Sequence, residues 1–277
     1  MTGRIKDMNV IITGASGGLG RVLATECGRR GYNIFLTDIN QRGLISLKQG
    51  IERQFKVCVT AKACDLTNAD SVDQLMSVID YHGICFDMLI NVVGIDYDGD
   101  FLGQDREKIT KIVSINNEAT LRITHDILRR RRTGKKFTLI FVSSLASMYP
   151  MPLKATYAAS KRFLLDFALA LSQELKNKNA NVLTLCPGGL VTTKEAMRGI
   201  AVQGFWGSVT TNPLEVVARK TIDNALNGKR IYIPGLFNRV LSFFGKIIPR
   251  SWVAAVIYFR WNKAQNKWMQ YGEPKST

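Results

Sequence analysis

A tyrosine and a lysine stand four residues apart, at Tyr157 and Lys161, within a stretch that has helical periodicity. On a helix this spacing places both side chains on one face. A free phenol has a pKa of about 10, too high for easy proton transfer near neutral pH, but a neighbouring ammonium stabilises the phenolate and lowers that pKa. The pair therefore indicates a general acid and base, with an ordinary exposed helix pair as the alternative.

Two serines precede this pair. Ser143 and Ser144 end an apolar run that starts at Phe137. The carboxyl end of a strand is where α/β sheets place their ligands, so a hydroxyl there could bind a substrate oxygen and orient it toward the phenol. We favour Ser144, which lies thirteen residues before Tyr157.

A glycine-rich turn follows the first apolar run and leads into a helical stretch. It reads Gly14-Ala15-Ser16-Gly17-Gly18-Leu19-Gly20. Glycines permit a tight turn, let backbone N–H groups approach a pyrophosphate, and let the helix pack closely on the strand. The helix N-terminus then presents the positive end of its dipole to the phosphates. The turn predicts a dinucleotide site, with a ligand-free strand-to-helix turn as the alternative.

Asp38 ends the second apolar run, eighteen residues after Gly20. That is close to the ~20-residue spacing expected of a carboxylate that binds the adenosine ribose hydroxyls. The same carboxylate would repel the 2′-phosphate of NADP, and neither Gly17 nor Ile39 supplies a basic side chain, although Arg42 is near in sequence. We therefore predict NAD rather than NADP, with a helix N-cap role for Asp38 as the alternative.

Short apolar runs alternate with amphipathic stretches along most of the chain. The expected strands are Met8–Thr13, Asn33–Thr37, Val57–Ala63, Met88–Val93, Phe137–Ser143, Val182–Cys186 and Arg230–Ile233. The expected helices are Leu19–Arg30, Arg42–Gln54, Ala69–His82, Asp105–Lys111, Asn117–Arg132, Thr156–Lys176 and Pro213–Asn227. The runs do not alternate with polar residues, which is typical of parallel strands covered on both faces. The pattern predicts an α/β fold: a single-domain, Rossmann-like, doubly wound parallel sheet of about seven strands with helices on both faces.

In combination, these residues resemble the short-chain dehydrogenases/reductases over roughly Met8 to Gly235. Further motifs of that family are matched by Asn116, by the pair Asp65 and Leu66, and by Pro187, Gly188 and Thr192. One segment departs from the family. The usual Asn-Asn-Ala-Gly after the fourth strand is Asn91-Val92-Val93-Gly94 here, with both ends kept and a more apolar middle.

The resemblance implies hydride transfer between NAD(H) and a carbonyl or alcohol carbon. Tyr157 would exchange the proton with the substrate oxygen, and Lys161 would lower the phenol pKa and bind the nicotinamide ribose. Ser144 would polarise the carbonyl, and Asn116 would hold a water that passes protons to Lys161. The residues implied to hold the cofactor are Gly14, Ser16, Gly17, Gly18, Leu19, Gly20, Asp38, Asp65, Leu66, Asn91, Gly94, Tyr157, Lys161, Pro187, Gly188 and Thr192.

The loops expected around this site are largely apolar. They include Met148, Met151, Leu153, Leu190, Phe205 and Trp206. Flat side chains and adaptable methionines suit a bulky hydrophobic carbonyl or alcohol, such as a hydroxysteroid, unless they only pack the expected lid Thr193–Asn212 onto the domain. The alternatives are a 3-oxoacyl (ketoacyl) reductase, and a non-catalytic dinucleotide-binding sensor or scaffold.

Composition limits the class of protein. The 277 residues are 46% hydrophobic and 22% charged, which argues against disorder and fibres. Five scattered cysteines and two histidines do not form a metal-site pattern, so we expect no metal. Scattered thiols, no secretory signal and no apolar run of spanning length favour a cytoplasmic protein.

The formal net charge of +16 is unevenly placed, since Asp126–Lys136 supplies +5 and Arg239–Thr277 supplies +6. Such charge could attract nucleic acid, anionic lipid or an acidic substrate, but we expect no nucleic-acid partner because no recognition motif accompanies it. Arg129–Arg132 precede Gly134 and suit a solvated helix end, with contact to an anionic partner as the alternative.

We divide the chain into a dinucleotide-binding catalytic domain, residues 1–236, and a C-terminal helical extension, residues 237–277. The extension mixes aromatic, aliphatic and basic residues. It could pack on the domain, on a partner subunit or on a membrane surface. The resemblance also implies a homo-oligomer.

Overall fold

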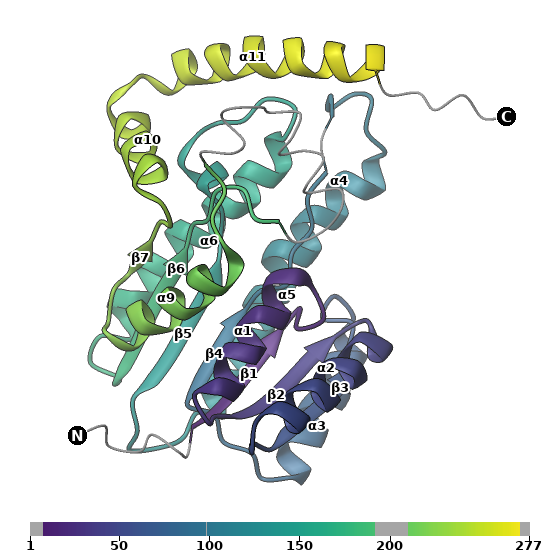
Figure 1. Ribbon diagram of the computed structural model, residues 1–277, viewed down its shortest axis with the longest axis vertical. Coiled ribbons are helices and arrows are strands. Elements are labelled where there is room, and N and C mark those ends of the chain that lie inside the picture. Colours follow the sequence, from purple (N-terminus) through teal and green to yellow (C-terminus); the bar gives the residue numbers. More distant parts are fainter. Residues whose placement is uncertain (1–7, 98, 192–209, 272–277) are drawn as a thin grey trace, which may run out of the picture.

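Seven strands form a single parallel sheet in the order β3-β2-β1-β4-β5-β6-β7. The strands are β1 Asn9–Thr13, β2 Asn33–Asp38, β3 Val59–Ala63, β4 Met88–Asn91, β5 Phe137–Val142, β6 Ala180–Leu185 and β7 Ile231–Tyr232. The strand order reverses between β1 and β4, and such a switch point is where open α/β sheets bind ligands. The expected seven-stranded, doubly wound parallel sheet is confirmed (Figure 1).

This computed structural model describes residues 8–97, 99–191 and 210–271, and their side chains except those of 246 and 261–271. Its helices are α1 Gly18–Arg29, α2 Gln41–Gln54, α3 Ala69–Tyr81, α4 Arg106–Val113, α5 Ala119–Arg129, α6 Ala155–Glu174, α9 Leu214–Leu226, α10 Leu236–Ile247 and α11 Arg250–Tyr271. Two short turns complete the elements: η1, a π-helix at Ser114–Glu118, and η2, a 3-10 helix at Leu145–Met148.

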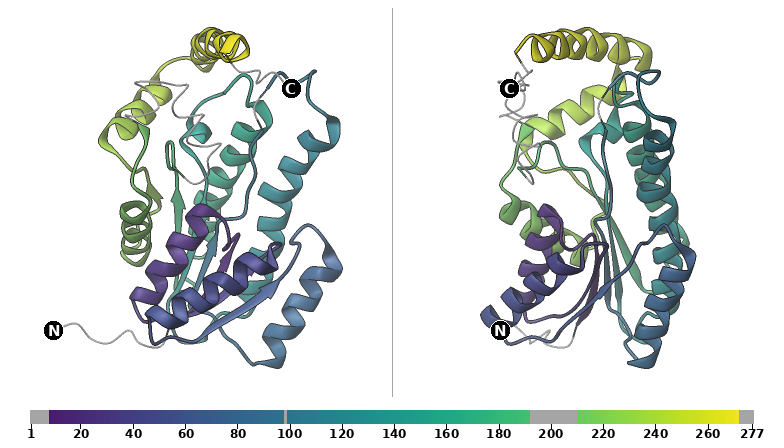
Figure 2. Two further views of the ribbon diagram at one scale, coloured as in Figure 1. Left: turned by 45° about the vertical axis from the view of Figure 1, so that its right-hand side comes forward. Right: turned by 90° about the vertical axis from the view of Figure 1, so that its right-hand side faces the viewer.

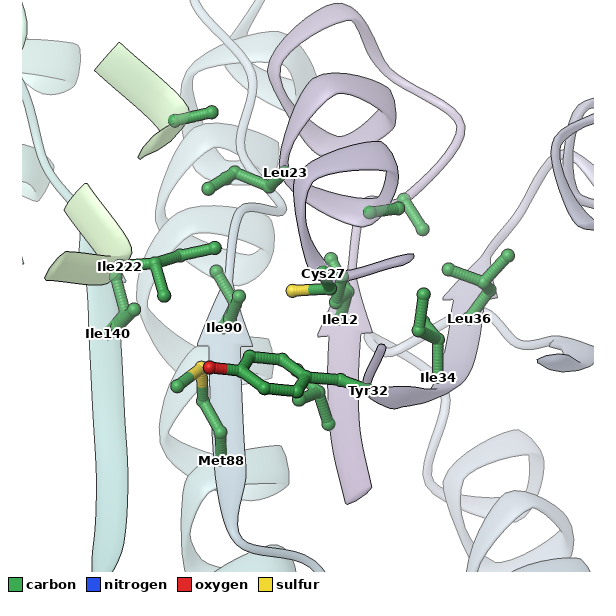
Figure 3. Packing of buried hydrophobic residues seen from close by; sticks show 14 of the residues in the cluster. Ile12, Leu23, Cys27, Tyr32, Ile34, Leu36, Met88, Ile90, Ile140 and Ile222 are labelled. Carbon is green, nitrogen blue, oxygen red and sulfur yellow. The ribbon is translucent and has the colours of Figure 1, made fainter. Parts of the chain in front are cut away.

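The hydrophobic core has one layer on each face of the sheet. Successive residues of a strand point to opposite faces, and in β1 the side chains of Val10 and Ile12 join the layer under α1, α2 and α9, whereas Ile11 joins the layer under α3, α5 and α6. Figure 2 shows the helices on the two sides of the sheet. In Figure 3, Leu23 and Cys27 of α1 lie over Ile12 and Ile90 of the two central strands. This double cover explains why the central strands β1, β4 and β5 are mostly apolar, whereas the edge strand β3 is only partly buried.

The expected helix Asn117–Arg132 ends early, at Arg129. Phe86 N donates to Arg130 O, and Arg132 N donates to Phe86 O, so the chain after α5 runs beside the start of β4. The Arg130 guanidinium binds both carboxylate oxygens of Asp80, at 2.6 and 2.7 Å, and Arg132 lies 3.1 Å from the buried Asp87. These arginines therefore tie α5 to α3 and β4, and the hypothesis of a freely solvated helix end is wrong for Arg130 and Arg132.

One continuous helical segment is present where the sequence predicted two separate helices, Asp105–Lys111 and Asn117–Arg132. Helix α4 passes into η1 and then into α5 without leaving helical backbone angles. The π turn adds a residue to the helical repeat at the point where two asparagines enter the core. Turns of this kind often mark functional sites.

The C-terminal helices α10 and α11 lie beyond one end of the sheet, away from the N-terminus (Figures 1 and 2). Among the described residues, no helix combines the length and the apolar character that crossing a bilayer requires. The same part of the chain contains no group of three or more metal-ligating side chains.

The core layer under α6 can be tested with two phenylalanines that contact the same ring. Phe141 of β5 is fully buried and Phe163 is 43% exposed, and both rings face Phe167. We expect Phe141→Ala to lower the free energy of unfolding by about 3–5 kcal/mol because it opens a cavity. Phe163→Ala should cost about 1 kcal/mol, the value of one aromatic pair. Urea denaturation measures both, and equal losses would contradict this account of the core.

Candidate active site

Helix α6 carries Tyr157 and Lys161 on one face, with the ammonium close to the phenol ring. Lys161 Nζ lies 5.8 Å from the centroid of the Tyr157 ring and donates to Val142 O at 3.1 Å. The lysine is only 4% exposed. Burial lowers the pKa of Lys161 to about 8, although the nearby Asp96 and Cys186 oppose this shift. The helix thus presents a titratable ammonium at the carboxyl end of β5.

Gly94 makes room for that ammonium. A Cβ on Gly94 would lie 2.8 Å from Lys161 Nζ and 3.1 Å from Asn116 Oδ1. The end of the Asn91–Gly94 segment therefore needs glycine for close approach rather than for an unusual backbone angle. The structure brings Gly94, Asn116, Tyr157 and Lys161 together at one place, as the sequence predicted.

Asn116 lies at the centre of the π turn and is fully buried. Its Oδ1 accepts from Ile95 N at 2.8 Å, and its Nδ2 donates to Ile95 O and to Ser160 Oγ. Both amide hydrogens are therefore used to hold the β4 loop against α6. A water relay toward Lys161 would therefore have to use an oxygen of Asn116, in the side chain or the main chain, as an acceptor.

The two serines after β5 have different environments. Ser143 is 3% exposed, and its hydroxyl donates to Lys161 O at 2.7 Å, so it fastens α6 to the sheet. Ser144 caps η2, and its Oγ accepts from Ala146 N at 3.1 Å. An accepting hydroxyl keeps its own hydrogen for another partner. Its hydroxyl hydrogen can therefore reach a substrate oxygen, and this role for Ser144 stays a prediction.

A second ammonium, which the sequence analysis missed, lies beside the tyrosine. Lys154 Nζ is 5.5 Å from the centroid of the Tyr157 ring, and it forms an ion pair with Asp96. Gly99 N donates to Leu153 O at 2.8 Å, which joins the same two loops. Asp96 and Lys154 are 58 residues apart in sequence, so no local pattern could have paired them.

The glycine turn has the shape that a dinucleotide requires. Gly14 has a φ of +62°, and a Cβ there would lie 2.8 Å from Val93 N. A Cβ on Gly20 would lie 2.2 Å from Gly14 O. Helix α1 begins after Gly17 with no side-chain cap and no acidic residue in its first turn. Its first N–H groups and its dipole are therefore available to phosphates, and the residues present fit a bound dinucleotide.

Asp38 is held against this turn. One of its carboxylate oxygens accepts from Ser16 N at 3.0 Å and the other accepts from Asn40 N at 3.0 Å. Asn40, not Asp38, is the N-cap of α2, since its side chain accepts from Gly43 N. Arg21 was missed by the sequence analysis, and its guanidinium donates to Ser16 O at 2.7 Å. The Arg21 guanidinium therefore binds the same turn that the Asp38 carboxylate binds.

Three further residues expected at the cofactor have local structural partners. Asp65 accepts from both Thr67 N and Thr67 Oγ1, at 2.9 and 2.7 Å, and Leu66 is buried in the core. Asn91 is 3% exposed, and its Nδ2 donates to Thr124 Oγ1 at 2.9 Å. Their contact with a cofactor stays a prediction.

The Pro187–Gly188 segment lies beside the serine turn and under the C-terminal extension. Pro187 O accepts from Leu145 N at 2.7 Å, and a Cβ on Gly188 would lie 2.8 Å from Asn238 Nδ2 of α10. No sequence signal had linked Asn238 to this motif. Thr192 and most of the expected lid, residues 193–209, lie outside the described residues.

A hollow adjoins Tyr157 between the β4 loop, α4 and the start of α6. Its lining includes Tyr97, Phe101, Ile109, Ile112, Leu153 and Lys154. The lining is mostly apolar with one cation at the tyrosine end.

Curated proteins similar to this chain include very-long-chain 3-oxoacyl-CoA reductases. The very-long-chain 3-oxoacyl-CoA reductases of Laccaria bicolor and Vanderwaltozyma polyspora are 30% and 33% identical to this chain over 174 and 182 residues. Each match covers 62% of this chain and 52% of the relative. The chain therefore spans about half the length of the curated relatives it matches.

Solved structures share the fold at lower identity. L-sorbose reductase from Gluconobacter frateurii, complexed with NADPH and L-sorbose, superposes with a TM-score of 0.75 at 18% identity, covering 83% of this chain and 96% of its own. A 3-oxoacyl-[acyl-carrier protein] reductase from Brucella melitensis with bound NAD gives 0.73 at 20% identity, covering 84% and 91%.

The family model described as short chain dehydrogenase matches residues 8–199, which include the glycine turn, Asn116, Ser144, Tyr157 and Lys161. This range is well over half of the chain. With the sheet, the glycine turn and the Tyr157–Lys161 pair in place, the chain belongs to the short-chain dehydrogenase family of oxidoreductases.

Proposed function

We propose that this protein is an NAD(H)-dependent reductase of 3-oxoacyl thioesters. The substrate class is taken from the relatives, which are named for 3-oxoacyl-CoA. The grouping of Tyr157, Lys161 and Asn116 supports carbonyl chemistry. The relatives favour an acyl chain over the hydroxysteroid that the sequence analysis put first. The filled catalytic positions favour an enzyme over a dinucleotide-binding scaffold.

The chain's own residues would handle the substrate oxygen and its proton, while bound NADH supplies the hydride. The Ser144 hydroxyl would donate to the ketone oxygen and so polarise the carbonyl. Tyr157 would give its phenolic proton to the same oxygen, and the Lys161 ammonium would stabilise the phenolate that remains. Val142 O and Gly94 keep that ammonium in place.

The preference for NAD depends on Asp38. Its carboxylate already accepts two backbone N–H groups, and its remaining lone pairs could accept from ribose hydroxyls. A 2′-phosphate would lie close to this negative charge. Arg21 reduces the repulsion, but its guanidinium is engaged by Ser16 O. We therefore expect NADH to bind more tightly than NADPH.

The cellular compartment and the oligomeric state of the protein are further parts of the proposed function. The five cysteines are free thiols, which fits a reducing cytoplasm. We expect a homo-oligomer, as the family resemblance implies, with a small hydrophobic molecule as substrate.

The substrate class is tested by following NADH absorbance with 3-oxoacyl-CoA thioesters of increasing chain length, and with a matched set of ketosteroids. We expect kcat/KM to rise by about fourfold for each added methylene that becomes buried. The ketosteroids should give little turnover. Faster reduction of the steroids would restore the hydroxysteroid hypothesis, and no turnover with either set would count against the enzyme.

Tyr157→Phe removes the proton donor while keeping the ring. We expect kcat to fall by about 10²–10⁴-fold, with the affinity for NADH, measured by fluorescence titration, unchanged. Tyr149→Phe is the matched control, because burial raises the pKa of that phenol to about 12 and its hydroxyl has no hydrogen-bond partner. The control should retain turnover, and loss of NADH binding in Tyr157→Phe would instead assign Tyr157 a structural role.

Lys161 should make NADH binding depend on pH. Burial lowers its pKa to about 8 in the free protein, and the anionic dinucleotide should raise that pKa again, so binding takes up a proton. The affinity is then full below about pH 8 and falls as the pH rises above it, by about tenfold for each unit of pKa shift. Fluorescence titrations across this range check it. The same pH dependence in Lys161→Met would contradict the assignment.

A further inference from the structure

Helix α10 buries two polar residues on one face and exposes a stripe of apolar residues on the opposite face. Asn238 is fully buried, Ser242 is 6% exposed, and Gly245 follows on the same face. The opposite stripe, spaced by three or four residues, is Leu236, Val240, Phe243 and Ile247, which are 73%, 44%, 61% and 64% exposed. A surface helix of a water-soluble domain normally has the reverse arrangement.

Contacts on the inner face fix this orientation. Asn238 Nδ2 donates to Thr210 O at 3.0 Å and to Pro234 O at 2.8 Å. Gly245 lies so close to the Tyr149 ring that a Cβ would come within 2.1 Å of it. Rotating α10 to bury its apolar stripe would break the hydrogen bonds of Asn238 and lift Gly245 off Tyr149. The stripe is therefore held outward by the fold.

The exposed apolar surface continues onto α11. Trp252, Val256 and Phe259 are spaced by four and three residues, and are 70%, 60% and 73% exposed. Figures 1 and 2 show α11 next to α10, at the end of the molecule that also carries the loops after β4 and β5. Stripes of exposed apolar residues on two neighbouring, successive helices indicate an interaction surface rather than scattered exposure.

The positive charge of this surface indicates which kind of partner it binds. No Asp or Glu occurs from Asn224 to Gly272, whereas Arg239, Arg250 and Arg260 are exposed on the same two helices. A second copy of the same surface would bring like charges together, which opposes association. Basic side chains around exposed aromatic and aliphatic residues are complementary to an anionic lipid bilayer.

We propose that the outward faces of α10 and α11 form an interfacial anchor that binds anionic membrane surfaces. The apolar residues enter the boundary between headgroups and acyl chains, and the arginines bind the lipid phosphates. Tyr149, on which Gly245 packs, follows Ser144 by five residues, so the bilayer lies beside the loop of the candidate site. If the proposed function holds, a long acyl substrate reaches that site from the lipid.

The test is sedimentation of the full-length protein with phosphatidylcholine vesicles that contain or lack phosphatidylserine. Wild type should bind only the anionic vesicles, and added salt should weaken binding. Phe243→Ser with Ile247→Ser should lower the partition coefficient by at least about tenfold. Arg250→Gln with Arg260→Gln should lower it by about fivefold for each arginine. All substituted side chains are exposed, and circular dichroism verifies that the variants fold.

A matched control removes one aromatic and one cation elsewhere. Tyr81→Ser with Arg53→Gln changes residues of α3 and α2, where Tyr81 is 87% exposed and Arg53 is exposed, and it should bind vesicles as wild type does. Failure of wild type to bind anionic vesicles, or equal loss in the control, overturns the proposal. So does a lower oligomeric state of the Phe243/Ile247 variant by ultracentrifugation, because a second copy would then cover the stripe.

Turnover of a short, water-soluble 3-oxoacyl thioester separates this inference from the proposed function. Vesicle binding without turnover supports the anchor and counts against the reductase. Turnover without vesicle binding overturns the anchor alone. Both sets of variants should reduce the soluble substrate at the wild-type rate, since their side chains lie outside the candidate site.

Discussion

A buried ammonium at the carboxyl end of the sheet is the constraint around which the site is built. Taking a lysine out of water is costly unless polar partners replace the solvent. Lys161 has Val142 O as a direct acceptor, and the face of the Tyr157 ring lies nearby. This arrangement only works because Gly94 has no side chain to occupy the same space. The low pKa of Lys161 follows from the same burial.

The neighbouring polar groups hold the segments that surround this ammonium. Ser143 fastens the main chain of Lys161 to the end of β5, and Asn116 binds both the β4 loop and Ser160. Asn117 also donates to Ser160 O. An α-helix of regular repeat would direct only some of these side chains inward, so the π turn at Ser114–Glu118 supplies the extra residue. The unusual turn is explained by the polar contacts that it makes possible.

The large positive charge of the chain has two different roles. Around α5 the arginines are partnered by Asp80 and Asp87 and hold elements of the domain together. In the C-terminal extension no Asp or Glu occurs before Glu273, and Arg239, Arg250 and Arg260 are exposed. The arginines after α5 therefore act as structural ties, whereas those of α10 and α11 lie at the surface.

The sequence alone determined the sheet, the glycine turn and the Tyr157–Lys161 pair, because each depends on local spacing: buried strands are continuously apolar, and residues four apart share a helix face. It also placed Asn116 and Gly94 at the site through resemblance. Tertiary structure decided the rest. Four features depend on segments that come together only after folding. They are the ion pair of Lys154 and Asp96, the hydrogen bond from Arg21 to Ser16 O, the early end of α5 and the outward apolar stripe of α10. Spacing along the sequence does not predict these contacts between distant segments. The packing of the helices against the sheet determines which polar groups come within hydrogen-bonding distance.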